Sequence, residues 1–336
     1  MKYSNVGIIG AGNWGTTLAL ILDSQGKKVK LFEPIRERFN NLKKWRENKE
    51  FLPGYKIPES VFITNEPKEL SENCDFIFFV LPSKFVGEIA SLFKSYIDKD
   101  KIVASFIKGV DPDSLKRISE IIEAEIPSQK REVVVVSGPS IAREVVMGVP
   151  TSLVAASFNL EKAKKIQRFL SSDKLRVYTS SDVIGVELGG AFKNVYAIAS
   201  GICDGMSLGM NAKAALITRG MAELSLLGEK MGGRKETFAG LSGFGDLIVT
   251  SFSPYSRNRT FGERLGRGES VEKILSEMVE VVEGIRTTKS IVALSNKYKV
   301  EMPIAKEVYS VLYEGKSPFD SMRDLMKREL KEEWKK

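Results

Sequence analysis

The sequence predicts an α/β fold in which a doubly wound parallel sheet is followed by an all-helical domain. Over the first half of the chain, short apolar runs alternate with amphipathic stretches of helix length, which is the rhythm of repeated β-α-β units. From about residue 180 the strand pattern stops, and long helical periodicities continue to the end. We therefore place a sheet domain at residues 1–180 and a helical domain at residues 181–336.

The predicted strands are short and apolar. In chain order they span residues 6–9, 29–32, 61–64, 76–81, 102–106, 133–136 and 153–156. A helical pattern lies between the first two strands and ends at Gly26. The helical domain is predicted to begin with a long helix from Asp182 to about Gly201, with a serine or aspartate of residues 180–182 as its N-cap.

The composition is that of an ordinary globular protein. The chain has 336 residues, of which 43% are hydrophobic and 28% charged, and this length suits two domains with separate cores. Its apolar runs are of strand length, so no integral membrane segment is expected. An apolar strand is predicted almost at the N-terminus, so no signal peptide is expected. Cys74 and Cys203 lie far apart without metal-ligand spacing, so we expect two buried thiols, no metal site and a cytoplasmic protein.

The distribution of charge argues against nucleic acid as a partner. The formal net charge is +8, but lysines and arginines are dispersed among acids and form no stripe with interleaved aromatic residues. A modest positive excess suits small anionic substrates instead.

The chain also contains no histidine. Acid–base chemistry near neutral pH must therefore use a carboxylate, a tyrosine, a cysteine or a lysine.

A glycine-rich turn predicts dinucleotide binding. The sequence G-A-G-N-W-G follows the first strand, opens a helix and contains Gly10, Gly12 and Gly15. These glycines allow a tight turn, close approach of a pyrophosphate to the backbone, and close packing of helix on strand. Glu33 ends the second strand, where an acid accepts hydrogen bonds from the ribose hydroxyls. Glu33 favours NAD over NADP, whereas the nearby Arg36 favours NADP.

Lys193 is the candidate for acid–base chemistry. On the predicted long helix it shares a stripe with small residues, among them Gly189 and Gly190. Each glycine inside a helix is unfavourable by about 1 kcal/mol relative to alanine, so we expect another part of the chain to approach closely there. A lysine buried at such a contact has a lowered pKa. The competing interpretation is a lysine that extends from the helix surface to water.

Other candidate residues lie at the ends of predicted elements. Lys108 follows a strand at the carboxyl edge of the sheet, where α/β proteins bind ligands, although many lysines there are simply exposed. Asp246 follows a glycine-rich bend, where it could act as a helix N-cap and nothing more, or cap the helix and still face the site. Ser256 is a good N-cap for a helix that starts with Arg257 and Asn258, and such a helix start with an arginine can bind phosphate.

The sequence resembles the bacterial NAD(P)-dependent glycerol-3-phosphate dehydrogenases over nearly its whole length. The resemblance is carried, in the family's order, by G-A-G-N-W-G-T-T-L-A, F-V-L-P-S, I-K-G, V-S-G-P-S-I-A-R-E, V-E-L-G-G-A-F-K-N-V, N-A-K-A-A-L-I-T-R-G, G-D-L-I-V-T, S-R-N-R-T-F-G and V-V-E-G-I-R-T. It implies a Rossmann-type domain followed by a helical substrate domain, and a homodimer. It also implies reversible reduction of dihydroxyacetone phosphate to sn-glycerol 3-phosphate with NADH or NADPH, which feeds glycerophospholipid synthesis.

The resemblance also implies roles for individual residues. It makes Lys193 the general acid and base. The implied substrate contacts are Lys108, Gly138, Ser140, Asn194, Asp246, Thr250, Ser256, Arg257 and Asn258. The implied cofactor contacts are Gly10, Gly12, Asn13, Trp14, Gly15, Glu33, Arg36, Lys108, Ala142, Arg257, Val281 and Glu283. Serine at position 140 stands where threonine is also common, and Phe32-Glu33-Pro34 departs from the family's usual, more polar residues, which leaves the choice between NAD and NADP open.

Two other functions compete with this one. A β-hydroxyacid dehydrogenase of the 6-phosphogluconate or ketopantoate type would share the fold and a lysine on the first helix of the second domain. The motifs S-R-N-R and G-D-L-I-V-T favour the phosphoglycerol pattern over that alternative. A nucleotide-sensing protein without turnover is the third hypothesis. It predicts that Lys193→Met changes stability alone, whereas an enzyme would keep cofactor binding and lose rate.

Overall fold

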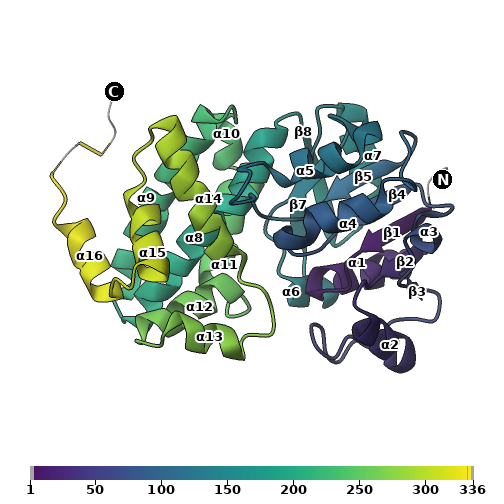
Figure 1. The fold of residues 1–336 in the computed structure, drawn as a ribbon, viewed down its shortest axis with the longest axis horizontal. Helices are drawn as coiled ribbons and strands as arrows, with labels where there is room; N and C mark the ends of the chain where they lie inside the picture. Colours follow the sequence, from purple (N-terminus) through teal and green to yellow (C-terminus); the bar gives the residue numbers. More distant parts are fainter. Residues whose placement is uncertain (1–3, 331, 334–336) are drawn as a thin grey trace.

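The protein forms two domains that lie side by side (Figure 1). The structure, a computed structural model, describes residues 4–330, 332 and 333. The first domain is a sheet covered by helices, and in the described residues the second domain is helical throughout. Strand β8 ends at Ser180 and helix α8 begins at Val183, so the boundary proposed at residue 180 falls in the connection between the two domains.

The described part of the first domain contains an 8-stranded sheet in the order β3-β2-β1-β4-β5-β6-β7-β8. Neighbouring strands run parallel except for β6 and β7, which are antiparallel. The strands are β1 (Asn5–Ile9), β2 (Lys28–Phe32), β3 (Phe62–Thr64), β4 (Phe76–Phe79), β5 (Ile102–Ser105), β6 (Val134–Ser137), β7 (Thr151–Ala156) and β8 (Leu175–Ser180). The prediction of a doubly wound α/β fold is confirmed.

Two details of the sheet differ from the sequence prediction. A wholly parallel sheet is wrong for β6 and β7, because an apolar run buried on both faces reads the same in either direction. Strand β8 was not among the predicted strands. It lies at the edge of the sheet and buries Leu175 and Val177 while Arg176 and Tyr178 face solvent, so it alternates instead of forming an apolar run.

Helices cover both faces of the sheet. The core on one face includes apolar side chains of α1 (Asn13–Ser24), α2 (Arg36–Trp45) and α7 (Leu160–Leu170). The core on the other face includes those of α3 (Pro67–Ser71), α4 (Val86–Phe93) and α5 (Ile118–Glu125). The short α6 (Ala142–Val146) lies between β6 and β7. The carboxyl edge of the sheet is left free to face the second domain.

Helix α8 (Val183–Gly205) lies at the centre of the helical domain (Figure 1). Asp182 caps it, because its Oδ1 accepts a hydrogen bond from the Gly185 amide at 2.9 Å, and this confirms the predicted N-cap. The helix runs one turn beyond the predicted end. The remaining helices are α9 (Gly209–Lys230), α10 (Lys235–Phe238), α11 (Asp246–Phe252), α12 (Arg257–Gly266), α13 (Val271–Glu277), α14 (Glu283–Tyr298), α15 (Pro303–Tyr313) and α16 (Pro318–Met326).

Two predictions about composition can be compared with the structure. Cys74 and Cys203 are both free and buried, which confirms the expectation of unpaired thiols. Among the described residues, no helix combines the length and the hydropathy that crossing a membrane requires.

Candidate active site

A cleft of about 950 Å³ separates the carboxyl edge of the sheet from the helical domain. Most of the site residues predicted from the sequence line it. They are Gly10, Gly12, Asn13, Trp14, Glu33, Lys108, Ser140, Ala142, Lys193, Asn194, Asp246, Thr250, Ser256, Arg257, Asn258, Val281 and Glu283. Gly15, Arg36 and Gly138 do not line it. The fold therefore brings together residues that are spread over most of the chain.

The turn between β1 and α1 is shaped to receive a pyrophosphate. Gly10 has a φ of +110°, and a Cβ there would collide with the Val80 carbonyl. A Cβ on Gly15 would collide with the Gly10 carbonyl, which explains why Gly15 packs behind the turn and does not face the cleft. A Cβ on Gly12 would meet nothing within 4 Å, so the backbone there is open to a ligand. No side chain caps the N-terminus of α1, so its first amides are available to an anion.

Glu33 stands at the end of β2 and faces the same cleft. Its Oε1 accepts a hydrogen bond from the Ile35 amide at 3.0 Å, and burial raises the pKa of the carboxyl above its ordinary value. Arg36 is exposed at the start of α2 and does not line the cleft. Arg38 lines the cleft instead and is paired with Glu50. The arginine whose charge acts on Glu33 is thus already paired with another carboxylate.

Lys193 is buried and lines the cleft beside a cluster of polar side chains. Its Nζ is 2.5 Å from Thr250 Oγ1 and 3.1 Å from Asp246 Oδ1. The other oxygen of Asp246 accepts a hydrogen bond from Lys108 Nζ at 2.6 Å. Lys108 also donates to the Gly138 carbonyl at 3.0 Å. One buried carboxylate therefore holds two lysines that come from different domains.

The environment of Lys193 lowers its pKa from 10.5 to about 8. Burial is the largest cause, since the side chain is 5% exposed and the charged form loses its hydration. Asp246 opposes this effect, whereas the positive charges of Lys108 and Arg257 add to it. The interpretation of Lys193 as a lysine extended to water is wrong. The amine can exchange its proton close to neutral pH.

Asparagine side chains form the floor of the cleft beside Lys193. Asn194 Nδ2 donates to the Lys108 carbonyl at 3.4 Å, and Asn258 Nδ2 donates to Asn194 Oδ1 at 3.0 Å. Asn258 Oδ1 in turn accepts from the Gly284 amide at 2.9 Å. This chain of hydrogen bonds fixes the amide orientations and ties the sheet domain to α8, α12 and α14.

The glycines that precede Lys193 lie at the predicted close approach. A Cβ on Gly190 would collide with Ser137 Oγ, at the end of β6. A Cβ on Gly189 would come within 3.1 Å of the Ser242 carbonyl, in the π-helical turn η3 (Leu241–Gly245). Helix α8 therefore packs directly against the edge of the sheet at this point, and Lys193 follows one turn later.

The N-terminus of α12 forms the outer wall of the cleft. Ser256 caps the helix, and its Oγ accepts from the Arg259 amide at 3.2 Å. Arg257 is partly exposed, and its Nη1 lies 3.1 Å from the Val281 carbonyl and 3.0 Å from a carboxylate oxygen of Glu280. A guanidinium at a helix N-terminus provides a suitable site for a phosphate.

A second contact between the domains closes the cleft near Val281. Glu283, the first residue of α14, accepts hydrogen bonds from the Ser83 amide at 2.9 Å and from Ser83 Oγ at 2.6 Å. Ser83 lies just beyond β4, at the carboxyl edge of the sheet. The Ser140 hydroxyl points to the Gly138 carbonyl, 3.0 Å away, in the turn after β6.

The sequence patterns do not point to several side chains that line the cleft, among them Arg38, Arg143 and Tyr255. The guanidinium of Arg143 lies over the Tyr255 ring, 5.2 Å from its centroid. Arg143 belongs to the quoted motif S-I-A-R-E, and Tyr255 directly precedes S-R-N-R. Their position next to predicted site residues in the sequence is the signal that could have identified Arg143 and Tyr255.

The fold and the cleft together define a class of protein, the two-domain dehydrogenases that use a dinucleotide. Comparisons with known proteins identify the family. Residues 5–163 match the family described as NAD-dependent glycerol-3-phosphate dehydrogenase N-terminus, and residues 182–323 match the corresponding C-terminus. The chain is 46% identical over 322 residues to glycerol-3-phosphate dehydrogenase [NAD(P)+] of Bacillus pumilus, with 96% of this chain and 93% of that protein covered.

Further relatives agree. Identity to the enzyme of the same name from Bacillus subtilis is 44% over 324 residues, which cover 96% of this chain and 94% of that one. The crystal structure of glycerol-3-phosphate dehydrogenase from Coxiella burnetii is 36% identical, with a TM-score of 0.92 and coverage of 97% and 99% of the two chains. The chain therefore belongs to the NAD-dependent glycerol-3-phosphate dehydrogenase family and is an oxidoreductase, which confirms the resemblance noted in the sequence.

The competing functions are not favoured. A ketopantoate reductase from Ralstonia eutropha superposes with a TM-score of 0.60 at 13% identity, which is a likeness of fold alone. Membership of an enzyme family also argues against a nucleotide sensor without turnover.

Proposed function

We propose that this chain catalyses the reversible reduction of dihydroxyacetone phosphate to sn-glycerol 3-phosphate with NADH or NADPH. Lys193 donates the proton to the ketone oxygen in reduction and removes the proton of the alcohol in oxidation. The observation that carries the assignment is the buried Lys193 amine, which lines the cleft with a pKa of about 8 between Asp246 and Lys108. A proton donor with a pKa near the working pH is the most effective one.

The residues around Lys193 orient its proton. Thr250 Oγ1 at 2.5 Å and Asp246 at 3.1 Å occupy two of the three directions of an ammonium group, which leaves one direction for the substrate oxygen. Lys108 brings a second positive charge to the same place and favours the electron-rich oxygen that develops during reduction. The bound nicotinamide supplies the hydride. Asn194 and Asn258 present amide groups for the hydroxyl and phosphate oxygens of the substrate.

The cofactor fits the opposite side of the cleft. The open backbone at Gly12 and the uncapped start of α1 suit the pyrophosphate. Glu33 suits the ribose hydroxyls and repels a 2′-phosphate, and Arg38 is already paired with Glu50. These features support a preference for NADH over NADPH. The phosphate of the substrate is assigned to Arg257 and the N-terminus of α12.

One assay tests the proposed function. Purified protein is mixed with dihydroxyacetone phosphate, and the absorbance of NADH or NADPH is followed over time. We expect turnover with both cofactors and higher kcat/KM with NADH. Folded protein that oxidises neither cofactor would overturn the assignment, and a clear preference for NADPH would overturn the role given to Glu33.

We also propose that the enzyme works in the cytoplasm and supplies the glycerol backbone of phospholipids. The two free, buried cysteines support a reducing compartment, and the proposed product, glycerol 3-phosphate, is the alcohol that phospholipids are built on. Depletion of the enzyme in its host should lower new phospholipid synthesis, and added glycerol 3-phosphate should restore it. Unchanged synthesis after depletion would contradict this role.

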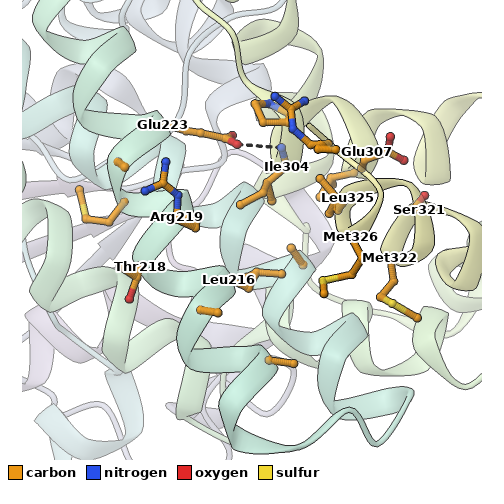
Figure 2. A pocket seen from close by; sticks show the side chains of 18 of the residues that line it. Leu216, Thr218, Arg219, Glu223, Ile304, Glu307, Ser321, Met322, Leu325 and Met326 are labelled. Atoms are coloured by element: carbon orange, nitrogen blue, oxygen red, sulfur yellow. Dashed lines mark hydrogen bonds between the residues drawn. The ribbon is translucent and has the colours of Figure 1, made fainter. Parts of the chain in front are cut away.

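We further propose that the chain is a homodimer and that a second copy covers an apolar groove in the helical domain. The groove, of about 1210 Å³, is lined by α9, α15 and α16, and Figure 2 shows Leu216 of α9 across from Met322 and Met326 of α16. Leu226 is 48% exposed and Met326 is 79% exposed. Two copies related by a twofold axis would each cover the groove of the other, together with the exposed Phe319 and Met326 side chains of α16, as an isologous interface requires.

Sedimentation velocity tests the dimer. The wild-type protein should sediment as a dimer, and Met326→Glu should shift it toward the monomer because a carboxylate would then be buried in the interface. Met147→Glu is the matched control, since Met147 is 56% exposed in the sheet domain and should leave the dimer intact. A monomeric wild-type protein, or a Met326→Glu protein that remains a dimer, would contradict this interface.

A further inference from the structure

The connection between β5 and α5, residues 106–117, belongs to the sheet domain in sequence but is built into the helical domain. Val110 is 1% exposed and lies in the hydrophobic core of the helical domain, and Leu115 packs against the same core. The Asp111 amide donates to the Lys116 carbonyl at 3.1 Å and closes the connection into a compact loop. We call this segment the 106–117 loop. It begins two residues before Lys108.

The tip of the 106–117 loop is fastened to α14. Ser290 Oγ donates to the Val110 carbonyl at 2.7 Å, and this serine is fully buried. Arg286 Nη2 lies 3.3 Å from Asp111 Oδ1. Apolar packing and polar contacts therefore both hold the loop against the second domain.

The end of the loop is fastened to α8 through Glu187. One oxygen of Glu187 accepts from Arg117 Nη1 and Ser119 Oγ, each at 2.7 Å, and the other accepts from the Ser119 amide at 2.7 Å. The side chains of Glu187 and Arg117 are 1% and 11% exposed, so the ion pair is shielded from water. A buried carboxylate with three donors is held in one orientation.

The beginning of the loop contacts α8 as well. Asn194 donates to the Lys108 carbonyl at 3.4 Å, and Gly190 lies between Asn194 and Glu187 on the same face of the helix, against Ser137. Glu187 and Asn194 are two helical turns apart, or roughly 10 Å along the axis. Contacts at two points along one face fix both the position of α8 along its axis and its rotation about that axis. Lys193 lies between those two points.

We propose that Glu187 is a positioning residue: through Arg117 and Ser119 it sets the placement of α8 on the 106–117 loop, and thereby the distance from Lys193 to Lys108. The proposal rests on the function proposed for Lys193. The loop and α8 are then held together as one unit, which keeps Lys108 and Lys193 side by side.

The variant Glu187→Gln tests this placement, because it keeps the shape of the side chain and removes its charge. We expect kcat for dihydroxyacetone phosphate reduction to fall by roughly ten- to a hundredfold, the loss that follows from misplacing a reacting group by about 1 Å. The Kd for NADH should stay within about twofold, since the pyrophosphate turn lies on the far side of the cleft. Hydrogen exchange of the amides in the 106–117 loop should become faster.

The pH profile separates placement from a general loss of stability. In the plot of kcat for reduction against pH, the alkaline limb is the range in which kcat falls as the pH rises. This limb reports the pKa of Lys193, which is set by burial and by Asp246, Lys108 and Arg257. Glu187 is not among these groups, so movement of the limb in Glu187→Gln reports a displaced Lys193. An unchanged limb together with wild-type kcat would overturn the proposal.

Two further variants make the test decisive. In Glu187→Gln, Arg117 loses its buried partner and keeps only the half-exposed Glu120, 3.1 Å away. The double variant E187Q/R117M removes this buried arginine as well; a purely structural ion pair predicts recovery of kcat, and the proposal predicts that kcat stays low. Glu223→Gln is the matched control, a buried carboxyl within the helical domain that accepts from the Ile304 amide at 2.8 Å (Figure 2). It should lower the melting temperature and leave kcat and the pH limb unchanged. Equal losses of kcat in the control and in Glu187→Gln would overturn the proposal.

The wild-type assay distinguishes failure of the proposed function from failure of the role proposed for Glu187. Absence of turnover in the wild-type protein would remove the proposed function. Turnover in the wild type that Glu187→Gln leaves unchanged, with unaltered hydrogen exchange in the 106–117 loop, would remove the positioning role alone.

Discussion

Replacing Asp246 by asparagine removes the one carboxylate that contacts both lysines of the cleft. Its oxygens lie 3.1 Å from Lys193 Nζ and 2.6 Å from Lys108 Nζ, and its side chain is almost fully buried. Asparagine keeps the shape but leaves the two positive charges facing each other. Asp246 raises the pKa of Lys193, so its loss must lower that pKa.

The size of the effect follows from the geometry. An opposite charge within about 4–6 Å changes a pKa by roughly 1–3 units. The pKa of Lys193 should therefore fall from about 8 to between roughly 5 and 7. At pH 7 the protonated fraction would drop from about nine-tenths to between about one-half and one-hundredth, and the reduction rate would fall by roughly two- to a hundredfold from protonation alone.

The assay is kcat for dihydroxyacetone phosphate reduction at saturating NADH, measured from about pH 5 to 9.5. The wild-type rate should fall as the pH rises through about 8, since reduction needs the protonated amine. In Asp246→Asn this limb should move to lower pH. Asp204→Asn is the matched control, because Asp204 also joins two cations, Lys213 and Arg259, each at 2.8 Å, but lies outside the cleft.

The position of the limb decides the outcome. A limb that stays near pH 8 in Asp246→Asn, or moves to higher pH, would refute the assignment of Lys193 as the titrating acid. A shift of equal size in Asp204→Asn would show that the limb reports global stability rather than the charge beside Lys193.

Three further predictions concern single contacts. Lys193→Met should lose roughly two to four decades in turnover while the Kd for NADH is retained; near-normal turnover would move the acid–base role to Lys108. Glu33→Ser should narrow or reverse the preference for NADH, measured as the ratio of kcat/KM values, and an unchanged ratio would contradict the ribose contact. Arg257→Ala should lower kcat/KM for dihydroxyacetone phosphate by about ten- to two-hundredfold, mainly through KM, and leave unphosphorylated dihydroxyacetone nearly unaffected. Equal losses for both ketones would show that Arg257 does not bind the phosphate.

The sequence predicts the sheet well where burial is two-sided. Strands such as β1 and β4 are continuous apolar runs, so their position follows from composition alone. The edge strand β8 is a different case, because only alternate residues are buried and Thr179 and Ser180 continue it as polar residues. Strand direction is not encoded in such runs, so the antiparallel pairing of β6 and β7 depends on the fold around them.

Many residues of the candidate site can be predicted from the sequence because they lie at the ends of strands and helices. Lys108 follows a strand and Arg257 begins a helix, and both positions open toward a cleft. The contacts that position α8 cannot be predicted from the sequence in this way. Glu187 and Arg117 are 70 residues apart, and no local pattern states that they pair. Arg38 likewise pairs with Glu50 only after α2 and the following segment fold together.

Because the chain contains no histidine, a lysine with a lowered pKa has to exchange the proton, and the groups around Lys193 set that pKa. Burial alone would suppress the charge of a lysine, and an unopposed second lysine would suppress it further. Asp246 acts in the opposite direction, so the pKa settles at about 8 as the result of large opposing effects. Such a balance depends on distances that both domains contribute to, since Lys108 comes from the sheet domain and Asp246 from the helical domain. A site of this kind therefore needs its domains fastened close to the lysines, and the 106–117 loop supplies that fastening.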